Sequence, residues 1–236
     1  MNRVFCTGDC HGQFKKISML CYQEKTTIDD YIIICGDVGL NYRCNELDIP
    51  NKNHLSKLPI TILCVHGNHE ERPYNISSYK KVYNDDLECY VYLEEQYPNI
   101  LFLEDGTFKL KEHLCLCIGG AYSIDKYYRI DRGYPWFPSE QLNNEEKERI
   151  LKILENKNSF FYIFSHTVPL KYERELEDLF LPSIDQSTVD KSMEEFLDKV
   201  EDRVNYKHWF FGHFHDHFDL TPNLTILYND IIELNL

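Results

Sequence analysis

Residues 31–37 read YIIICGD, an apolar run of strand length that stops at a glycine and an aspartate. The same arrangement occurs upstream in RVFCTGD, residues 3–9, and downstream in ITILCVHGN, residues 60–68. Short, continuously apolar runs are typical of buried strands. Polar residues at their ends favour an α/β sheet that carries its functional site on the loops at the strand ends.

Other parts of the chain add strands and helices to this pattern. Residues 13–22 place apolar side chains on one face of a helix. Two more helices are expected over 139–156, entered by Ser139, and over 187–200, capped by Ser187. Further strands are predicted within 99–110, 113–120, 160–166, 208–213 and 224–234. We therefore expect two mixed sheets packed face to face, with helices flanking them.

The overall composition limits the class of protein. The 236 residues suit one domain, 1–236. A net charge of −14 gives no basic footprint, so long nucleic acid is not an expected partner. No membrane-spanning run and no signal-peptide pattern is visible. The nine cysteines lie scattered, several in apolar runs, which predicts reduced, buried thiols in a cytoplasmic protein.

Histidine, aspartate and asparagine recur at the ends of five strand-like runs. In an extended segment, every second side chain points to the same side. Asp9 and His11 are therefore expected on one side of their segment, and so are His213 and His215. Cys10, between the first two, is expected to be a bystander. The five segments are GDCHG at 8–12, CGD at 35–37, HGNHE at 66–70, FSH at 164–166 and GHFH at 212–215.

These residue types point to a metal centre. The set combines carboxylates, imidazoles and an amide oxygen, and no cysteines have zinc-finger spacing. Such mixed oxygen and nitrogen ligands suit Mn, Fe, Zn or Ni, and the sequence does not rank these metals. Seven candidate ligands exceed what one ion needs. Two divalent ions that share one carboxylate fit better, and that arrangement serves phosphoryl hydrolysis.

The five segments, in this order, resemble the calcineurin-like metallophosphoesterases. The pattern of that superfamily is D-x-H, G-D, G-N-H-[DE], a lone His, and G-H-x-H, and each part has a match between residues 9 and 215. The chain is most similar to the small bacterial and phage members. The resemblance implies a four-layer α/β/β/α sandwich of two mixed sheets that hydrolyses a phosphate mono- or diester.

The resemblance also implies a role for each residue. The first ion would be held by Asp9, His11, Asp37 and His215. The second would be held by Asp37, Asn68, His166 and His213, so that Asp37 bridges the pair. A hydroxide between the ions would attack the phosphorus. His69 would not be a ligand but would protonate the leaving oxygen or stabilise the phosphoryl charge.

One departure from the pattern lies after the second strand. The protein phosphatase branch carries G-D-x-x-D-R-G there, and this chain has GDVGLNY. Leu40 replaces the aspartate that steadies the catalytic histidine, and Asn41 replaces a phosphate-binding arginine. This argues against a phosphoprotein phosphatase. Glu70 or Asn41 is the candidate for orienting His69 instead.

Candidate substrate contacts lie mainly in residues 119–140, GGAYSIDKYYRIDRGYPWFPSE. Arginine pairs with phosphate and aromatic rings stack on bases, so Arg129, Arg132 and Tyr127 are expected in a substrate-facing loop. The alternative is that this loop covers a sheet edge and its arginines pair with neighbouring aspartates. Arg72 is a further candidate phosphate contact and Arg43 another.

Two other functions stay open at this stage. A small phosphorylated substrate, such as a nucleotide, suits the acidic chain, whereas a nuclease or nucleic-acid end-processing phosphatase would act on a larger one. A non-catalytic metal-binding scaffold of the same fold is the second alternative. Such scaffolds tend to lose ligands or the catalytic histidine, and this chain has a residue of the required type at each of those positions. The sequence decides neither the oligomeric state nor the preferred ester.

Overall fold

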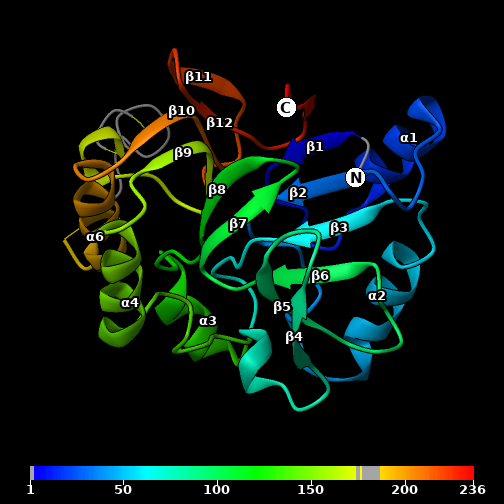
Figure 1. The fold of residues 1–236 in the computed structure, drawn as a ribbon. Coiled ribbons are helices and arrows are strands. Elements are labelled where there is room, and N and C mark those ends of the chain that lie inside the picture. The colour runs from blue at the N-terminus through cyan, green and yellow to red at the C-terminus, as the bar shows by residue number, and fades with distance from the viewer. Residues whose placement is uncertain (1–2, 174–175, 177–186) are drawn as a thin grey trace.

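Two β-sheets packed face to face form the centre of the protein, and helices cover both outer faces (Figure 1). The computed structural model describes residues 3–173, 176 and 187–236. Helices α1 (Lys15–Glu24) and α2 (Ile49–Leu55) cover the first sheet, and α4 (Asn144–Leu154) and α6 (Ser192–Glu201) cover the second. The four-layer α/β/β/α prediction is confirmed.

The first sheet has seven strands in the order β13-β1-β2-β3-β6-β5-β4. Its centre, β1-β2-β3-β6, is parallel, and the strands beyond it on each side pair antiparallel. The strand bounds are β1 Val4–Thr7, β2 Tyr31–Ile34, β3 Thr61–Cys64, β4 Lys80–Asn84, β5 Cys89–Leu93, β6 Ile100–Leu103 and β13 Ile231–Glu233.

The second sheet has six strands in the order β11-β12-β10-β9-β8-β7. Strands β8, β9, β10 and β12 run parallel, and β7 and β11 are antiparallel edges. The bounds are β7 Gly106–Leu110, β8 His113–Ile118, β9 Ser159–Ser165, β10 Asn205–Phe211, β11 Phe218–Thr221 and β12 Leu224–Ile226.

Alternation of side chains along the strands divides the core. In β1, Cys6 faces the second sheet, whereas Phe5 faces α1 and α2. In β10, Phe210 joins the layer between the sheets and Trp209 packs under α4 and α6. The helices are α1 Lys15–Glu24, α2 Ile49–Leu55, α3 Lys126–Arg132, α4 Asn144–Leu154 and α6 Ser192–Glu201, with short 3-10 turns at Glu46–Asp48 and Pro73–Asn75.

The expected starts of two helices are wrong. The helix predicted from Ser139 begins at Asn144, because Asn143 and Glu146 form a reciprocal capping box there. The helix predicted from Ser187 begins at Ser192, and its N-cap residue, Lys191, makes no side-chain capping hydrogen bond. A competing capping sequence, at Asn143, therefore explains the first of these two differences.

Several elements were not expected: helices α2 and α3 and strands β4, β5 and β11. Strands β4 and β5 form an antiparallel hairpin at the edge of the first sheet. Residues 126–132, expected as part of a loop, form α3, which ends at Gly133 with a left-handed φ of 67°.

In the described ranges, no helix has the length and apolarity to cross a membrane.

Candidate metal centre

The polar residues at the five strand ends converge on one site. The loops after β1, β2 and β3 of the first sheet meet the loops after β9 and β10 of the second, because parallel strands end at a common edge. Asp9 and Asp37 are almost fully buried there, at 2% exposure each. The structure therefore brings the candidate ligands from both sheets within reach of one another.

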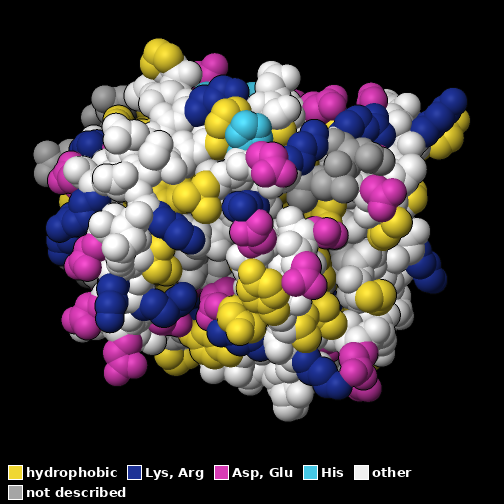
Figure 2. All heavy atoms as spheres, in the orientation of Figure 1, with side chains coloured by type: hydrophobic (Ala, Val, Ile, Leu, Met, Phe, Trp, Pro, Cys, Tyr) yellow, Lys and Arg dark blue, Asp and Glu magenta, His cyan; other side chains and the backbone are white. Residues whose placement is uncertain are grey.

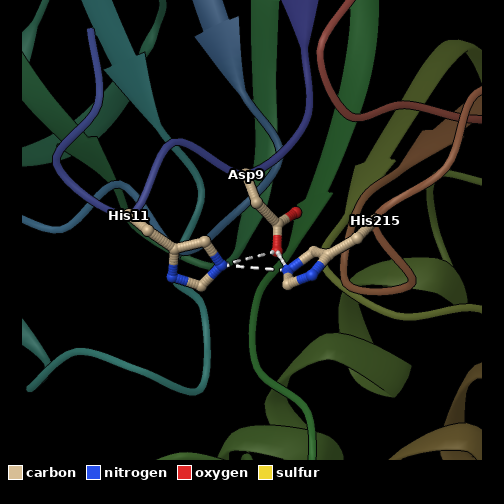
Figure 3. A group of neighbouring side chains, drawn as sticks. All are labelled: Asp9, His11 and His215. Carbon is tan, nitrogen blue, oxygen red and sulfur yellow. Dashed lines mark hydrogen bonds and ion pairs between the residues drawn. The ribbon is translucent and has the colours of Figure 1, made fainter.

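Asp9, His11 and His215 form the more exposed group. The two histidine rings point toward each other, with Nε2 atoms 2.9 Å apart, and His215 Nε2 lies 3.1 Å from Asp9 Oδ2 (Figure 3). Two unprotonated Nε2 atoms at this distance would repel, so a proton or a cation must lie between them. The carboxylate beside them stabilises a positive charge at this position.

Asp37, Asn68 and His166 form a buried group behind the first. His166 Nε2 lies 2.7 Å from Asn68 Oδ1 and 3.6 Å from Asp37 Oδ1. His166 Nδ1 lies 2.9 Å from the carbonyl oxygen of Cys35, to which it donates. That bond leaves Nε2 free to bind a metal, which is the usual arrangement for histidine ligands. The His213 ring packs 5.0 Å from the His166 ring.

The charge of the two carboxylates fits a cation site. Burial alone would raise the pKa of Asp9, but hydrogen bonds from His11 and His215 hold that pKa well below its usual value. Burial opposes ionisation of Asp37 in the same way, and the histidines beside it, His166 first, lower its pKa. Among the residues that the structure describes, three groups have ligand atoms that all lie within 4.8 Å of one another: Asp9, His11 and His215; His11, Asp37 and His69; Asp9, Asp37 and His166. The donor set thus fits divalent ions.

Backbone hydrogen bonds interlock the loops that carry these residues. The backbone N–H of His213 donates to Asp9 Oδ1, and that of His69 donates to Asp37 Oδ1, each at 2.8 Å. The N–H of His11 donates to the carbonyl oxygen of Asp37 at 2.8 Å. Each loop is therefore positioned by a loop from another strand.

Several candidate ligands hold an unusual backbone conformation. Non-glycine residues rarely adopt a positive φ, at a cost of about 1–3 kcal/mol each. The surrounding hydrogen bonds must offset that cost, and such strain is typical of functional sites. The four residues are His11 with φ 47°, Asp37 with φ 48°, His213 with φ 70° and His215 with φ 57°.

Two glycines of the motif allow the loops to approach. Gly36 has a φ of 92°, and a Cβ atom there would overlap the His166 ring. A Cβ atom on Gly212 would overlap the Asp9 carboxylate. Neither position can therefore carry a side chain without displacing a candidate ligand.

His69 lies at the solvent side of the site, and its surroundings differ from those expected. Its Nε2 lies 4.0 Å from Asp125 Oδ1, and its ring is 5.4 Å from the His11 ring and 6.4 Å from the Tyr42 ring. Burial, opposed by Asp37, lowers the pKa of His69. The same geometry groups His69 with His11 and Asp37 as potential ligands.

Neither residue proposed to orient His69 does so. The Glu70 carboxylate accepts hydrogen bonds from the backbone N–H groups of Val38, Gly39 and Gly67. Burial raises the pKa of Glu70 to about 8. Asn41 is fully buried, where its amide donates to the Glu71 carbonyl oxygen and accepts from the Tyr79 hydroxyl.

Arg72, predicted as a phosphate contact, has its charged group turned into the protein. Its guanidinium is 3% exposed and lies 2.6 Å from Asp105 Oδ2. It also donates to the carbonyl oxygens of Ser139 and Gly119. Arg72 therefore joins the loop after β3 to the connection between the two sheets and to residues 119–139, inside the protein.

The other predicted contacts have mixed surroundings. Arg129 is 2% exposed; it donates to Ser123 Oγ at 3.1 Å and lies 3.8 Å from Asp125 Oδ1. Arg132 is exposed beside Tyr128, and Tyr127 is 65% exposed. The Arg43 guanidinium lies over the Tyr42 ring. Arg129 pairs with Asp125, a contact of the kind expected if the arginines pair with neighbouring aspartates instead of facing the substrate.

Two contributions to the site were missed from the sequence. Ser123 Oγ accepts from Asn68 Nδ2 at 2.9 Å, which directs Asn68 Oδ1 toward His166, and Asp125 faces His69. The two residues are separated by one position just before α3, and only a clustering of polar residues after the GG dipeptide could have drawn attention to them. Cys10 is buried and belongs to none of the three ligand groups, as expected of a bystander.

The calcineurin-like phosphoesterase family model matches residues 2–217. The structure TT1561 of Thermus thermophilus superposes with a TM-score of 0.52 at 11% identity, covering 99% of this chain and 98% of that one. Phosphopantetheinyl hydrolase PptH from Mycobacterium tuberculosis superposes with a TM-score of 0.47 at 11% identity, covering 96% and 88%. No curated protein sequence matches this chain. The chain belongs to the calcineurin-like phosphoesterases, a family whose members bind divalent metal and hydrolyse phosphoesters.

Proposed function

We propose that the protein is a phosphoesterase with two divalent ions bridged by Asp37. The observation that supports this most directly is the orientation of one buried carboxylate. Its Oδ1 lies 3.6 Å from His166 Nε2, and its Oδ2 lies 3.8 Å from His11 Nε2. Its two oxygens therefore face two different groups of donors.

Each ion would have its own set of protein ligands. Asp9, His11 and His215 would complete the first site together with Asp37. The second would be completed by Asn68, His166 and His213. When bound, the ions would supply Lewis acidity and lower the pKa of a water molecule to the neutral range. Mn²⁺ is the first metal to test.

The remaining residues of the site would position the substrate and move a proton. His69 would donate a proton to the leaving oxygen, with Asp125 holding its ring in place. Burial lowers the pKa of His69, which eases release of that proton and also lowers the fraction of His69 that carries it. Ser123 would keep the oxygen of Asn68 directed into the centre.

A small phosphorylated molecule, with a nucleotide among the candidates, is the proposed substrate. On the face drawn in Figure 2, Lys and Arg side chains alternate with Asp and Glu and form no continuous basic stripe. Together with the net charge of −14, this surface is unsuited to a long nucleic acid. Arg132 and Tyr127, exposed on α3, are the proposed contacts to the outer part of the substrate.

All nine cysteines are free, which fits the proposed cytoplasmic location.

Metal-dependent turnover tests the proposal. Wild-type protein and His69→Ala are assayed with Mn²⁺, Zn²⁺, Ni²⁺ or chelator against p-nitrophenyl phosphate and bis(p-nitrophenyl) phosphate. We expect turnover only with metal, and a loss of about 10²–10⁴-fold in kcat for His69→Ala without loss of bound metal. Absence of turnover in protein that holds two ions per chain would favour the non-catalytic scaffold.

A further inference from the structure

In the described part of the chain, His11 lines two cavities that adjoin the candidate metal centre. The first, called here the His69 cavity, has a volume of about 460 Å³ and is lined by His11, His69, Tyr42, Arg43, Leu47 and Asn51 among others. The second, called the Tyr228 cavity, has a volume of about 370 Å³. Its walls include Asp9, His11, Gln13, Lys16, Met19 and Tyr228.

The Tyr228 cavity is built against the metal centre. The Tyr228 ring stacks on the ring of His215 with centroids 4.7 Å apart. Lys16 of α1 donates to the carbonyl oxygens of Gly8, Asp9 and Tyr228, which ties the helix to both neighbouring loops. The cavity therefore has a fixed wall on the side of His215, away from His69.

The two cavities differ in their access to the proposed proton donor. His69 lines the first cavity and is absent from the second. A leaving oxygen must lie within hydrogen-bond reach of the group that protonates it. The leaving alcohol therefore belongs in the His69 cavity, and the Tyr228 cavity is left for a group that stays on phosphorus.

A phosphomonoester carries one organic group, whereas a phosphodiester carries two. We propose that the substrate is a small phosphodiester, with its leaving group in the His69 cavity and its retained organic group in the Tyr228 cavity. This inference rests on the proposed function. Water adds its oxygen to phosphorus, the bond from phosphorus to the leaving oxygen breaks, and that oxygen takes up a proton. The products are one alcohol and one phosphomonoester.

Both cavities suit small organic groups. Both volumes lie within the range of about 300–1,000 Å³ that is typical of small-molecule sites. The His69 cavity offers the Tyr42 ring and the exposed Leu47, and the Tyr228 cavity offers Met19, which is 48% exposed. The lining combines apolar and polar side chains, as expected for sites that hold organic groups of a polar ester.

Three chromogenic esters with one leaving group test the inference on the metal-loaded protein. They are p-nitrophenyl phosphate, bis(p-nitrophenyl) phosphate and the p-nitrophenyl ester of thymidine 5′-monophosphate. We expect kcat/KM to be at least about tenfold higher for the diesters than for the monoester. We also expect thymidine 5′-monophosphate to accumulate as the end product.

Substitutions in the two cavities test which organic group of the ester each cavity holds. Met19→Trp fills the Tyr228 cavity and should lower the ratio of diester to monoester kcat/KM by about tenfold. Leu47→Trp should change that ratio by less than about twofold, because both esters place nitrophenol in the His69 cavity. Tyr22→Trp, one turn along α1 at a residue that is 84% exposed, is the matched control and should leave the ratio at the wild-type value.

The outcomes separate the two proposals. Metal-dependent turnover that favours the monoester, or a Met19→Trp ratio equal to that of the control, overturns the diester inference and leaves the phosphoesterase intact. Conversion of the thymidine ester through to thymidine and phosphate also overturns it. Turnover of none of the three esters, in protein that holds two ions, overturns the proposed function and the diester inference with it.

Discussion

His69 Nε2 and Asp125 Oδ1 lie 4.0 Å apart, and the carboxylate comes from the segment just before α3. The position after β2 where related phosphatases carry an aspartate holds Leu40, which is fully buried in the core under α1 and α2. Asp125 is held in turn 3.8 Å from the buried Arg129. Asp125, from a different segment of the chain than Leu40, is thus the carboxylate that lies near His69, the candidate proton donor.

Replacement of Asp125 should affect turnover more than binding. We expect Asp125→Ala to lower kcat by about tenfold with KM within about twofold of wild type, because the His69 ring loses its carboxylate neighbour. Asp125→Glu should restore part of the loss. Steady-state kinetics with Mn²⁺ provide the measurement. Asp131→Asn, exposed at the other end of α3, is the control, and an equal loss in that variant would contradict the assignment.

Replacement of Asp37 should remove metal. A neutral amide cannot bridge two cations as a carboxylate does, so Asp37→Asn should lose at least one of two ions. Metal content per chain, measured by mass spectrometry after gel filtration, checks this. Asp216→Asn, exposed in the loop after β10, should keep both ions. Two ions retained by Asp37→Asn would show that Asp37 is not the bridge.

Replacement of Arg72 should destabilise the fold. Removing the guanidinium leaves the Asp105 carboxylate, buried at 6% exposure, without its cation. Loss of one partner of such a pair typically costs about 3–5 kcal/mol. Urea unfolding of Arg72→Ala should show that loss, while the exposed Arg149→Ala should stay within about 0.5 kcal/mol of wild type. A raised KM with unchanged stability would instead return Arg72 to the substrate contacts.

Glu194 on α6 should make stability depend on pH. Burial, reinforced by Glu173, raises the pKa of Glu194 from 4.5 to about 8. Between these values the unfolded chain binds fewer protons than the folded one, so stability falls as pH rises. The stabilisation is complete below about pH 4.5 and is lost as pH passes through about 8.

Glu194→Gln should remove this dependence. In thermal melts from pH 5 to pH 9, the stability of the variant relative to wild type should increase as pH rises. The increase should reach a few kcal/mol at most, the order that the pKa shift implies. The adjacent Glu195→Gln, on the exposed side of α6, serves as control and should follow the wild-type curve. Parallel curves for Glu194→Gln and wild type would contradict the raised pKa.

The sheet strands could be predicted well because their signal is local. Apolar runs such as 31–35 are buried on both faces, so they need no partner to be recognised as strands. Strand β4 was missed because it is exposed or half-buried throughout and three of its five residues are Lys80, Lys81 and Asn84, and β5 was missed because only two of its positions are buried. Helix starts were misplaced where two capping sequences competed, as at Ser139 and Asn143.

The sequence by itself determined which residue types stand at the strand ends and in what order. Parallel strands of two sheets bring those ends to one edge, so Asp9, Asp37 and His166 could be placed at one site before any coordinates. Only the tertiary structure decided which side chains support them. Asp125, Ser123 and the two cavities depend on how residues 119–132 and α1 pack against the loops. Such packing sets distances between segments remote in the chain, and no local pattern encodes those distances.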